Sequence, residues 1–205
     1  MATSKKKMKK ITFLTAIISL ISFIYKLVLG ILSLSNVLIV AATSTFLVFL
    51  CKVLFIKNVT MTREKKKKAY LFMTILTFLY ALIFIAFVVI KVFGVDASNQ
   101  KTYEGIIGIL FISFILIMFI LSIINLKGAL EKTDIMVIGL KEMTFVSALA
   151  DAVIIEEFAY RTVSEYQHIE VFEQITKYFP LGIGILMVLV SIFMFIRFAR
   201  YKSEQ

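Results

Sequence analysis

Six stretches of the chain are apolar or nearly so, and short polar segments separate them. A transmembrane helix needs about 20 mostly apolar residues, and five stretches qualify outright while one is weaker. The approximate bounds of the six predicted spans are 11–34, 37–56, 69–93, 105–126, 135–155 and 181–198. The pattern therefore predicts an all-α fold, a polytopic transmembrane bundle of six helices that forms one integral membrane domain over residues 1–205.

The fifth stretch is the marginal one, because it contains Lys141, Glu142 and Asp151. A charged side chain near the centre of a membrane helix costs about 2.5–3.5 kcal/mol on insertion scales. Lys141 and Glu142 lie toward the cytoplasmic end and can extend to the interface, whereas Asp151, about four residues inside Ile155, cannot do so as easily. We expect either a crossing helix that the other spans shield from lipid, or a re-entrant or interfacial segment.

Composition supports a membrane protein and excludes several other classes. Hydrophobic residues make up 60% of the chain and the mean hydropathy is +0.97, whereas soluble domains are about 45–50% apolar. A single cysteine, Cys51, excludes an intramolecular disulfide. One cysteine and one histidine also argue against a zinc site, which needs about four nitrogen or sulfur ligands. We expect no metal and no cofactor.

The net charge of +10 comes from basic residues in short segments beside the spans. This placement follows the positive-inside rule and does not indicate a nucleic-acid partner. Two clusters serve as topology anchors, and each residue in them could also attract anionic lipid headgroups by about 1 kcal/mol. They comprise Lys5, Lys6, Lys7, Lys9 and Lys10 at the start of the chain, and Arg63, Lys65, Lys66, Lys67 and Lys68 between the second and third spans.

The same rule favours six crossings over five. With the N-terminus in the cytoplasm, the basic segment 57–68 is also cytoplasmic and the segment 95–104 faces outward. If residues 135–155 cross, the basic C-terminal sequence RFARYK (197–202) returns to the cytoplasm, and the loop 156–179, with five glutamates, faces out. We therefore predict a multi-pass protein of the cell membrane with both termini cytoplasmic.

Lys26 lies well inside the first predicted span, and Asp151 lies in the fifth. In the six-span arrangement both lie in the outer half of the membrane at similar depth. Intramembrane charges usually face the bundle interior and pair with one another, so we predict a Lys26–Asp151 ion pair. Its role could be structural, fixing helix register, or it could bind a proton or a substrate. The alternative is that Lys26 extends outward and makes no contact with Asp151.

A second motif is EEFAYR, residues 156–161, which matches the pattern EExxxR. The pattern resembles the first motif of the CAAX-type intramembrane endopeptidases, and the resemblance would make Glu156, Glu157 and Arg161 protease-like residues, with the glutamate acting as a general base. That family also needs two histidines in later spans, and this chain has only His168. We favour the structural interpretation, in which Glu157 and Arg161 pair at i,i+4 near the end of a helix.

The last third of the chain, from EKTD (131–134) through LKEMTFVSALADAVII (140–155) to the final span, resembles small six-span membrane proteins of Gram-positive bacteria that have no assigned activity. With no catalytic constellation evident, we expect a non-enzymatic accessory or regulatory component of a bacterial membrane complex. A small transport or substrate-binding subunit is the alternative, and an intramembrane protease comes third. The expected partners are the lipid bilayer, anionic headgroups, and another membrane protein or a second copy of the chain.

Overall fold

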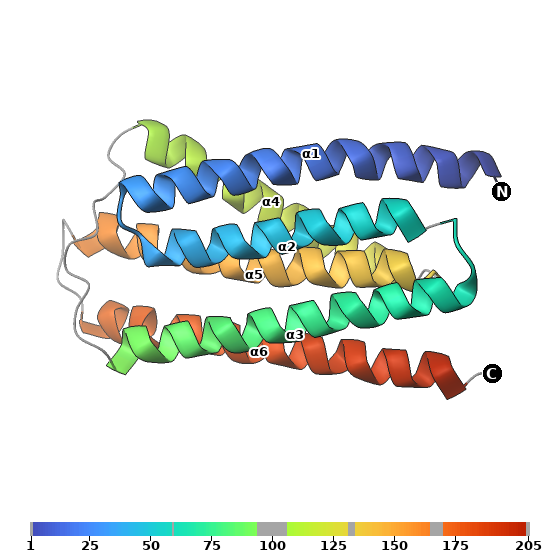
Figure 1. Cartoon of the computed structure of the whole chain (residues 1–205). Coiled ribbons are helices and arrows are strands. Elements are labelled where there is room, and N and C mark those ends of the chain that lie inside the picture. The colour runs from blue at the N-terminus through green and yellow to red at the C-terminus, as the bar shows by residue number, and fades with distance from the viewer. Residues whose placement is uncertain (1, 59, 94–105, 131–133, 165–169, 204–205) are drawn as a thin grey trace.

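The described part of the chain folds into six α-helices that lie side by side along one common direction (Figure 1). The computed structural model describes residues 2–58, 60–93, 106–130, 134–164 and 170–203. The helices are α1 (Ala2–Leu32), α2 (Asn36–Asn58), α3 (Arg63–Phe93), α4 (Ile106–Leu130), α5 (Ile135–Ser164) and α6 (Glu170–Ser203). The prediction of an all-α bundle of six helices is confirmed.

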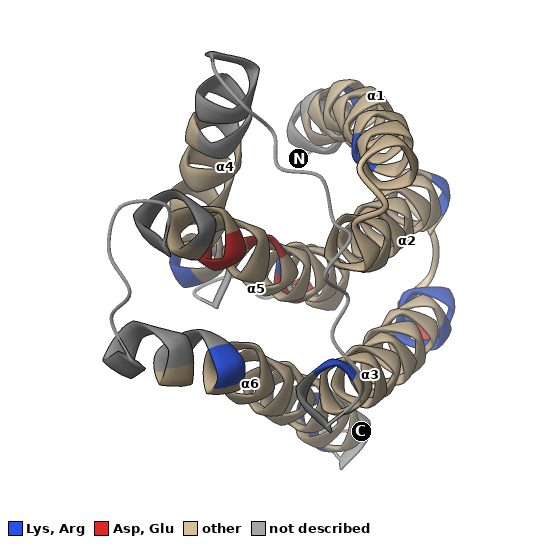
Figure 2. Ribbon diagram, turned by 90° about the vertical axis from the view of Figure 1, so that its left-hand side faces the viewer, with Lys and Arg blue, Asp and Glu red and all other residues tan. Residues whose placement is uncertain are grey.

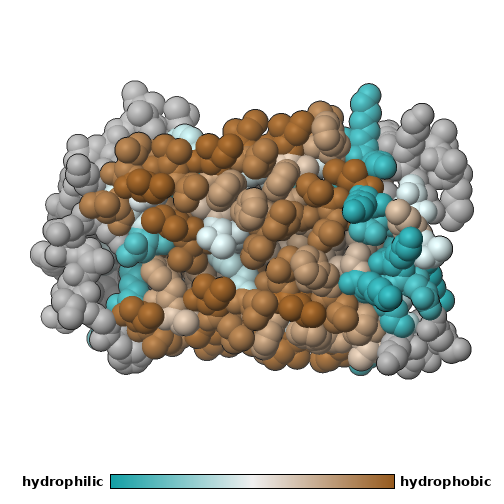
Figure 3. Space-filling model, viewed as in Figure 1, coloured by the Kyte–Doolittle hydropathy of each residue, from teal (hydrophilic) through white to brown (hydrophobic). Residues whose placement is uncertain are grey.

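The outer surface of the bundle is that of an integral membrane protein. Four helical segments are long and apolar enough to cross a membrane, and α4 contributes a shorter apolar segment, Ile115–Gly128. The four longer segments are Met8–Leu32, Asn36–Asn58, Arg63–Lys91 and Lys177–Tyr201. In Figure 3 apolar residues cover the middle of the visible face, and hydrophilic residues gather at the end where Figure 1 places both termini. We call this end the basic end.

Helices α1 and α2 form a tight hairpin through the short connection 33–35. Leu34 adopts a left-handed conformation with φ of 56°, and the amide of Ser35 donates to the Gly30 carbonyl at 2.9 Å. These contacts form a Schellman-type helix end. A Cβ on Gly30 would lie 2.9 Å from Cγ1 of Ile39, so glycine allows the two helices to approach closely.

Helix α5 is the least apolar of the predicted spans, yet it occupies the centre of the bundle. It packs against α2, α3, α4 and α6, and most of its side chains between Ile135 and Ile154 are buried. Its 30 residues form one continuous helix that lies alongside α2 and α3 (Figure 1). The absence of a reversal within α5 favours a crossing helix that its neighbours shield from lipid.

The helices extend beyond the predicted spans. The loop predicted over 156–179 is largely helical, because α5 continues to Ser164 and α6 begins at Glu170. Pro180 consequently lies inside α6, although it precedes the predicted sixth span. Apolar content marks where a helix enters lipid, whereas backbone hydrogen bonds continue the helix through polar sequence, so the two boundaries differ.

Candidate functional site

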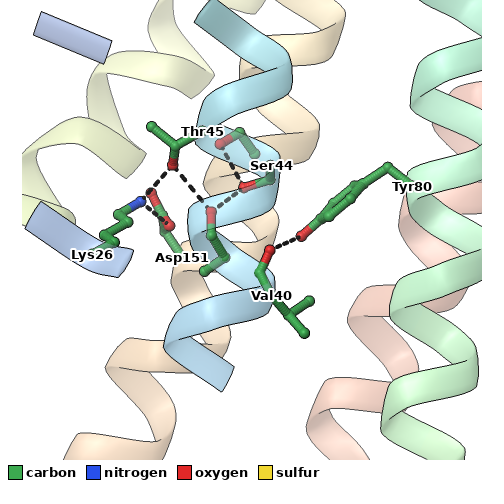
Figure 4. Close-up of polar contacts among 8 residues, drawn as sticks. Lys26, Val40, Ser44, Thr45, Tyr80 and Asp151 are labelled. Carbon is green, nitrogen blue, oxygen red and sulfur yellow. Dashed lines mark hydrogen bonds and ion pairs between the residues drawn. The ribbon is translucent and has the colours of Figure 1, made fainter. Parts of the chain in front are cut away.

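The predicted ion pair of Lys26 and Asp151 forms inside the bundle. Lys26 of α1 places its Nζ atom 2.5 Å from Oδ1 of Asp151 on α5, and only 2% and 8% of the two residues are exposed. The ammonium group also donates a hydrogen bond to Oγ1 of Thr45 on α2 at 3.0 Å (Figure 4). The charges are therefore compensated by each other and by a hydroxyl group.

Neighbouring hydroxyl groups join the helices that carry this pair. Ser44 of α2 and Ser147 of α5 share a hydrogen bond of 2.9 Å, one turn of α5 from Asp151. The hydroxyl of Tyr80 on α3 donates to the Val40 carbonyl at 3.3 Å (Figure 4). The Ser44–Ser147 bond links α2 to α5, and the Tyr80–Val40 bond links α3 to α2. These links hold Thr45 of α2 and Asp151 of α5 in place beside Lys26 of α1.

The Lys26–Asp151 pair lies in the wall of a partly enclosed cavity of about 660 Å³. Helices α1, α2, α4 and α5 all contribute to the lining, and Figure 2 shows α1 and α4 on opposite sides of this region. Hydroxyl and amide side chains contribute much of the polar lining: Thr12, Thr15, Ser19, Ser22, Thr45, Ser122, Asn125, Thr144 and Ser147.

Two further lysines line the same cavity. Lys52 of α2 donates hydrogen bonds to the carbonyl of Thr15 at 2.9 Å and to Oγ of Ser19 at 2.6 Å, and both acceptors are neutral. Lys141 of α5 donates to Oδ1 of Asn125 on α4 at 3.1 Å. The lining thus carries three lysines and one carboxylate, Asp151, so the fully ionised cavity has a charge of +2.

A separate polar cluster lies outside the cavity and joins α3, α5 and α6. Glu142 of α5 pairs with Arg197 of α6 and accepts a hydrogen bond of 3.1 Å from the hydroxyl of Tyr70 on α3. The sequence suggested that Glu142 would extend toward the interface, but the residue is only 4% exposed. Glu142 can be buried because Arg197 and Tyr70 are partners that compensate the desolvation of its carboxylate.

The structure describes the side chains of two of the three residues of the protease-like motif, Glu156 and Glu157. Glu157 lies 3.5 Å from Nζ of Lys91 on α3, and Glu156 lies one residue earlier on α5, partly buried. Arg161 belongs to α5, but its side chain lies outside the described residues, as does His168. The predicted Glu157–Arg161 pair therefore remains a prediction. Among the described residues, no group of three or more histidine, cysteine, aspartate or glutamate side chains could hold a metal ion.

The predicted lipid-contact residues lie at the basic end, in α1 and α3. Lys9, Lys10, Lys65 and Lys68 are exposed, and the side chains of residues 5–7 lie outside the described part. The other three residues of the set, Lys66, Arg63 and Lys67, contact other side chains or are partly covered by the protein. Lys66 pairs with Asp134 at 2.5 Å, Arg63 stacks over the ring of Tyr201, and Lys67 is partly buried. Contact with lipid headgroups remains a prediction for the whole set.

Lys52 and the hydroxyl residues of the lining were not predicted from sequence to belong to a site. The sequence nevertheless contains a pattern that could have indicated this lining. Polar residues recur every three or four positions along the first span, at Thr12, Thr15, Ser19, Ser22 and Lys26. This spacing places them on one face of a helix. The polar stripe lines the cavity in the structure.

Comparisons with known proteins assign no family to this site, since no family model, curated protein or solved structure matches the chain.

Proposed function

We propose that this integral membrane protein binds a small anionic ligand in the cavity between α1, α2, α4 and α5. The observation that carries the proposal is the charge of the lining, with three lysines against one carboxylate. Buried charge within a membrane protein is costly and usually marks a substrate or ion site. Among the roles considered from sequence, this arrangement favours the transport or substrate-binding subunit.

A purely structural role would explain only some of the charged residues that line the cavity. The Lys26–Asp151 pair compensates its own charges and can hold α1 against the rest of the bundle. Lys52 and Lys141 line the cavity in addition to that pair, and the hydrogen bonds of Lys52 to Thr15 and Ser19 go to neutral acceptors. Two ammonium groups lining a polar space create a positive potential that concentrates anions.

Thiol accessibility tests the proposal with reagents that differ only in charge, so the identity of the ligand is not required. Cys51 is the chain's one cysteine, so Cys51→Ala gives a cysteine-free background for Ser22→Cys in the cavity wall. Two methanethiosulfonate reagents of similar size, one carrying a sulfonate and one a trimethylammonium group, are compared after normalisation to a free thiol. We expect the anionic reagent to react about tenfold faster at Ser22→Cys.

The controls separate the cavity from the membrane surface. Ile21→Cys, on a neighbouring residue that is 62% exposed on the outside of the bundle, should show no such preference. Adding Lys52→Gln and Lys141→Gln to the Ser22→Cys variant should remove the preference. Equal rates for the two reagents at Ser22→Cys, or a preference that survives loss of both lysines, would contradict the proposal.

The accessory or regulatory role in a larger complex stays a hypothesis from sequence. Co-purification in mild detergent is its direct test, since a stoichiometric membrane partner would support that role. Such a partner would be compatible with a binding cavity, because a substrate-binding subunit can also belong to a complex.

A further inference from the structure

The cavity is only partly enclosed, and α1 and α4 form two of its walls without packing closely against each other. Helix α1 packs against α2, and among the described residues no Cα atom of α1 lies within 8 Å of a Cα atom of α4. Both helices nevertheless line the cavity. Ile18 of α1 and Met118 and Leu121 of α4 line it while being 38–49% exposed, and Figure 2 shows the ribbons of α1 and α4 separated on this side of α5.

From this opening we infer that the ligand is an anionic phospholipid, which enters laterally between α1 and α4 and places its phosphate between Lys52 and Lys141. The inference rests on the proposed function, because it names the ligand class of the same cavity. A lipid needs a path from the bilayer, an anion site near the headgroup layer, and an apolar surface for its chains. Each of these features can be examined separately.

The two lysines lie at the right depth for a headgroup. Lys52 is five residues before Lys57 near the end of α2, and Lys141 is six residues after Ile135 at the start of α5. At 1.5 Å per residue these separations are about 8–9 Å from the basic end. The polar layer on each side of a bilayer is about 5–8 Å thick, so both lysines lie just below it, where a phosphate drawn a short way into the cavity would meet both ammonium groups.

The rest of the lining suits an amphiphile better than a free anion. Ile11, Ile18, Met118 and Leu121 provide apolar contact beside the opening. Ser122 also lines the cavity, and its hydroxyl is buried and has no hydrogen-bond partner among the described residues. Buried polar groups are normally satisfied, and a rotation of this side chain toward the cavity would let a ligand ester or glycerol oxygen supply the missing partner. A free phosphate would use the lysines and leave the apolar lining without a role.

Tryptophan fluorescence provides the test, because the chain contains no tryptophan. Met118→Trp places a fluorophore at the opening, and Phe193→Trp places a matched one on α6, where residue 193 is 63% exposed. Each variant is reconstituted in vesicles containing either brominated phosphatidylglycerol or brominated phosphatidylcholine, whose chains quench tryptophan. We expect phosphatidylglycerol to quench Met118→Trp at least about threefold more effectively, whereas Phe193→Trp should respond equally to both lipids.

Charge variants identify the anion site. Lys52→Gln with Lys141→Gln should abolish the preference for phosphatidylglycerol at Met118→Trp, whereas Lys9→Gln with Lys10→Gln, which removes two exposed lysines of α1, should preserve it. The inference is overturned by equal quenching of Met118→Trp by both lipids. It is also overturned if the surface pair removes the preference and the cavity pair does not.

The outcomes also distinguish this inference from the proposed function. If Ser22→Cys retains its selectivity for the anionic thiol reagent but Met118→Trp shows no lipid preference, the cavity binds anions and the lipid assignment is wrong. Protection of Ser22→Cys by millimolar inorganic phosphate, without protection by phosphatidylglycerol, would assign the site to a free anion. Loss of selectivity in both experiments would overturn both conclusions.

Discussion

At the scale of single residues, the length of the Lys26 side chain decides how α1, which packs against α2, also reaches α5. Among the described residues, the Cα atoms of α1 approach those of α2 within 8 Å but not those of α5. The aliphatic stem of Lys26 crosses this distance, and its ammonium group reaches both Thr45 and Asp151. The pair therefore links α1 to the centre of the bundle through side chains alone.

Breaking the pair should destabilise the protein strongly. Removing one member of a buried ion pair typically costs about 3–5 kcal/mol, because the other charge remains uncompensated. Lys26→Met and Asp151→Asn should each lower the thermal unfolding midpoint in detergent. The double variant should recover part of the combined loss, because no unpaired charge remains. Lys57→Met, at an exposed lysine of α2, is the control and should have little effect. Strict additivity of the two losses would show that the residues are not coupled.

At the scale of the helices, α5 depends on close packing against α3. Gly139 lies against the ring of Tyr70, and a Cβ at residue 139 would lie 2.6 Å from Cδ2 of that ring. The ring has little freedom to move, since Tyr70 is fully buried and its hydroxyl is hydrogen-bonded to Glu142 and to the Met194 carbonyl. Glycine at residue 139 therefore allows α3, α5 and α6 to meet around Tyr70.

Gly139→Ala should destabilise the bundle by about 1–3 kcal/mol, the usual cost of overpacking a buried contact. Gly182→Ala provides a matched control on α6, because a Cβ there meets no atom within 4 Å. Alanine favours helix over glycine by about 1 kcal/mol, so the control should be neutral or slightly stabilising. Thermal unfolding in detergent measures both effects. Equal midpoints for the two variants would show that the ring of Tyr70 adjusts freely.

At the scale of the whole molecule, the distribution of charge gives the bundle a polarity. Both termini and the α2–α3 connection lie at the basic end (Figure 1), together with the lysines of the first turns of α3. This arrangement agrees with the positive-inside rule if the basic end is cytoplasmic. We therefore retain the proposal of six crossings with both termini in the cytoplasm.

Reporter fusions test this topology. Alkaline phosphatase is active only when exported, so a fusion after residue 205 should be inactive and one within residues 95–104 should be active. Green fluorescent protein fusions at the same positions serve as the converse control, because that protein fluoresces when it stays in the cytoplasm. An active phosphatase at the C-terminus would mean an odd number of crossings and would contradict the six-span arrangement.

Much of the architecture could be predicted because the bilayer restricts the possible structures. A long apolar segment in lipid must satisfy its backbone hydrogen bonds internally, and a helix does so. For this reason the six apolar stretches predict six helices, and charges within them, Lys26 and Asp151, are predicted to form an ion pair. The helix ends were less predictable, as α5 and α6 show, because helices continue beyond the lipid.

The sequence by itself determined the class of protein, the number of helices and the polarity of charge, since each follows from local composition and from the solvent that surrounds the chain. Only the tertiary structure decided that α5 lies at the centre, that Glu142 meets Arg197, and that Lys52 and Lys141 face the same cavity as the Lys26–Asp151 pair. The physical reason is that helix packing depends on contacts between residues far apart in the chain. A cavity arises where those contacts are absent, here between α1 and α4.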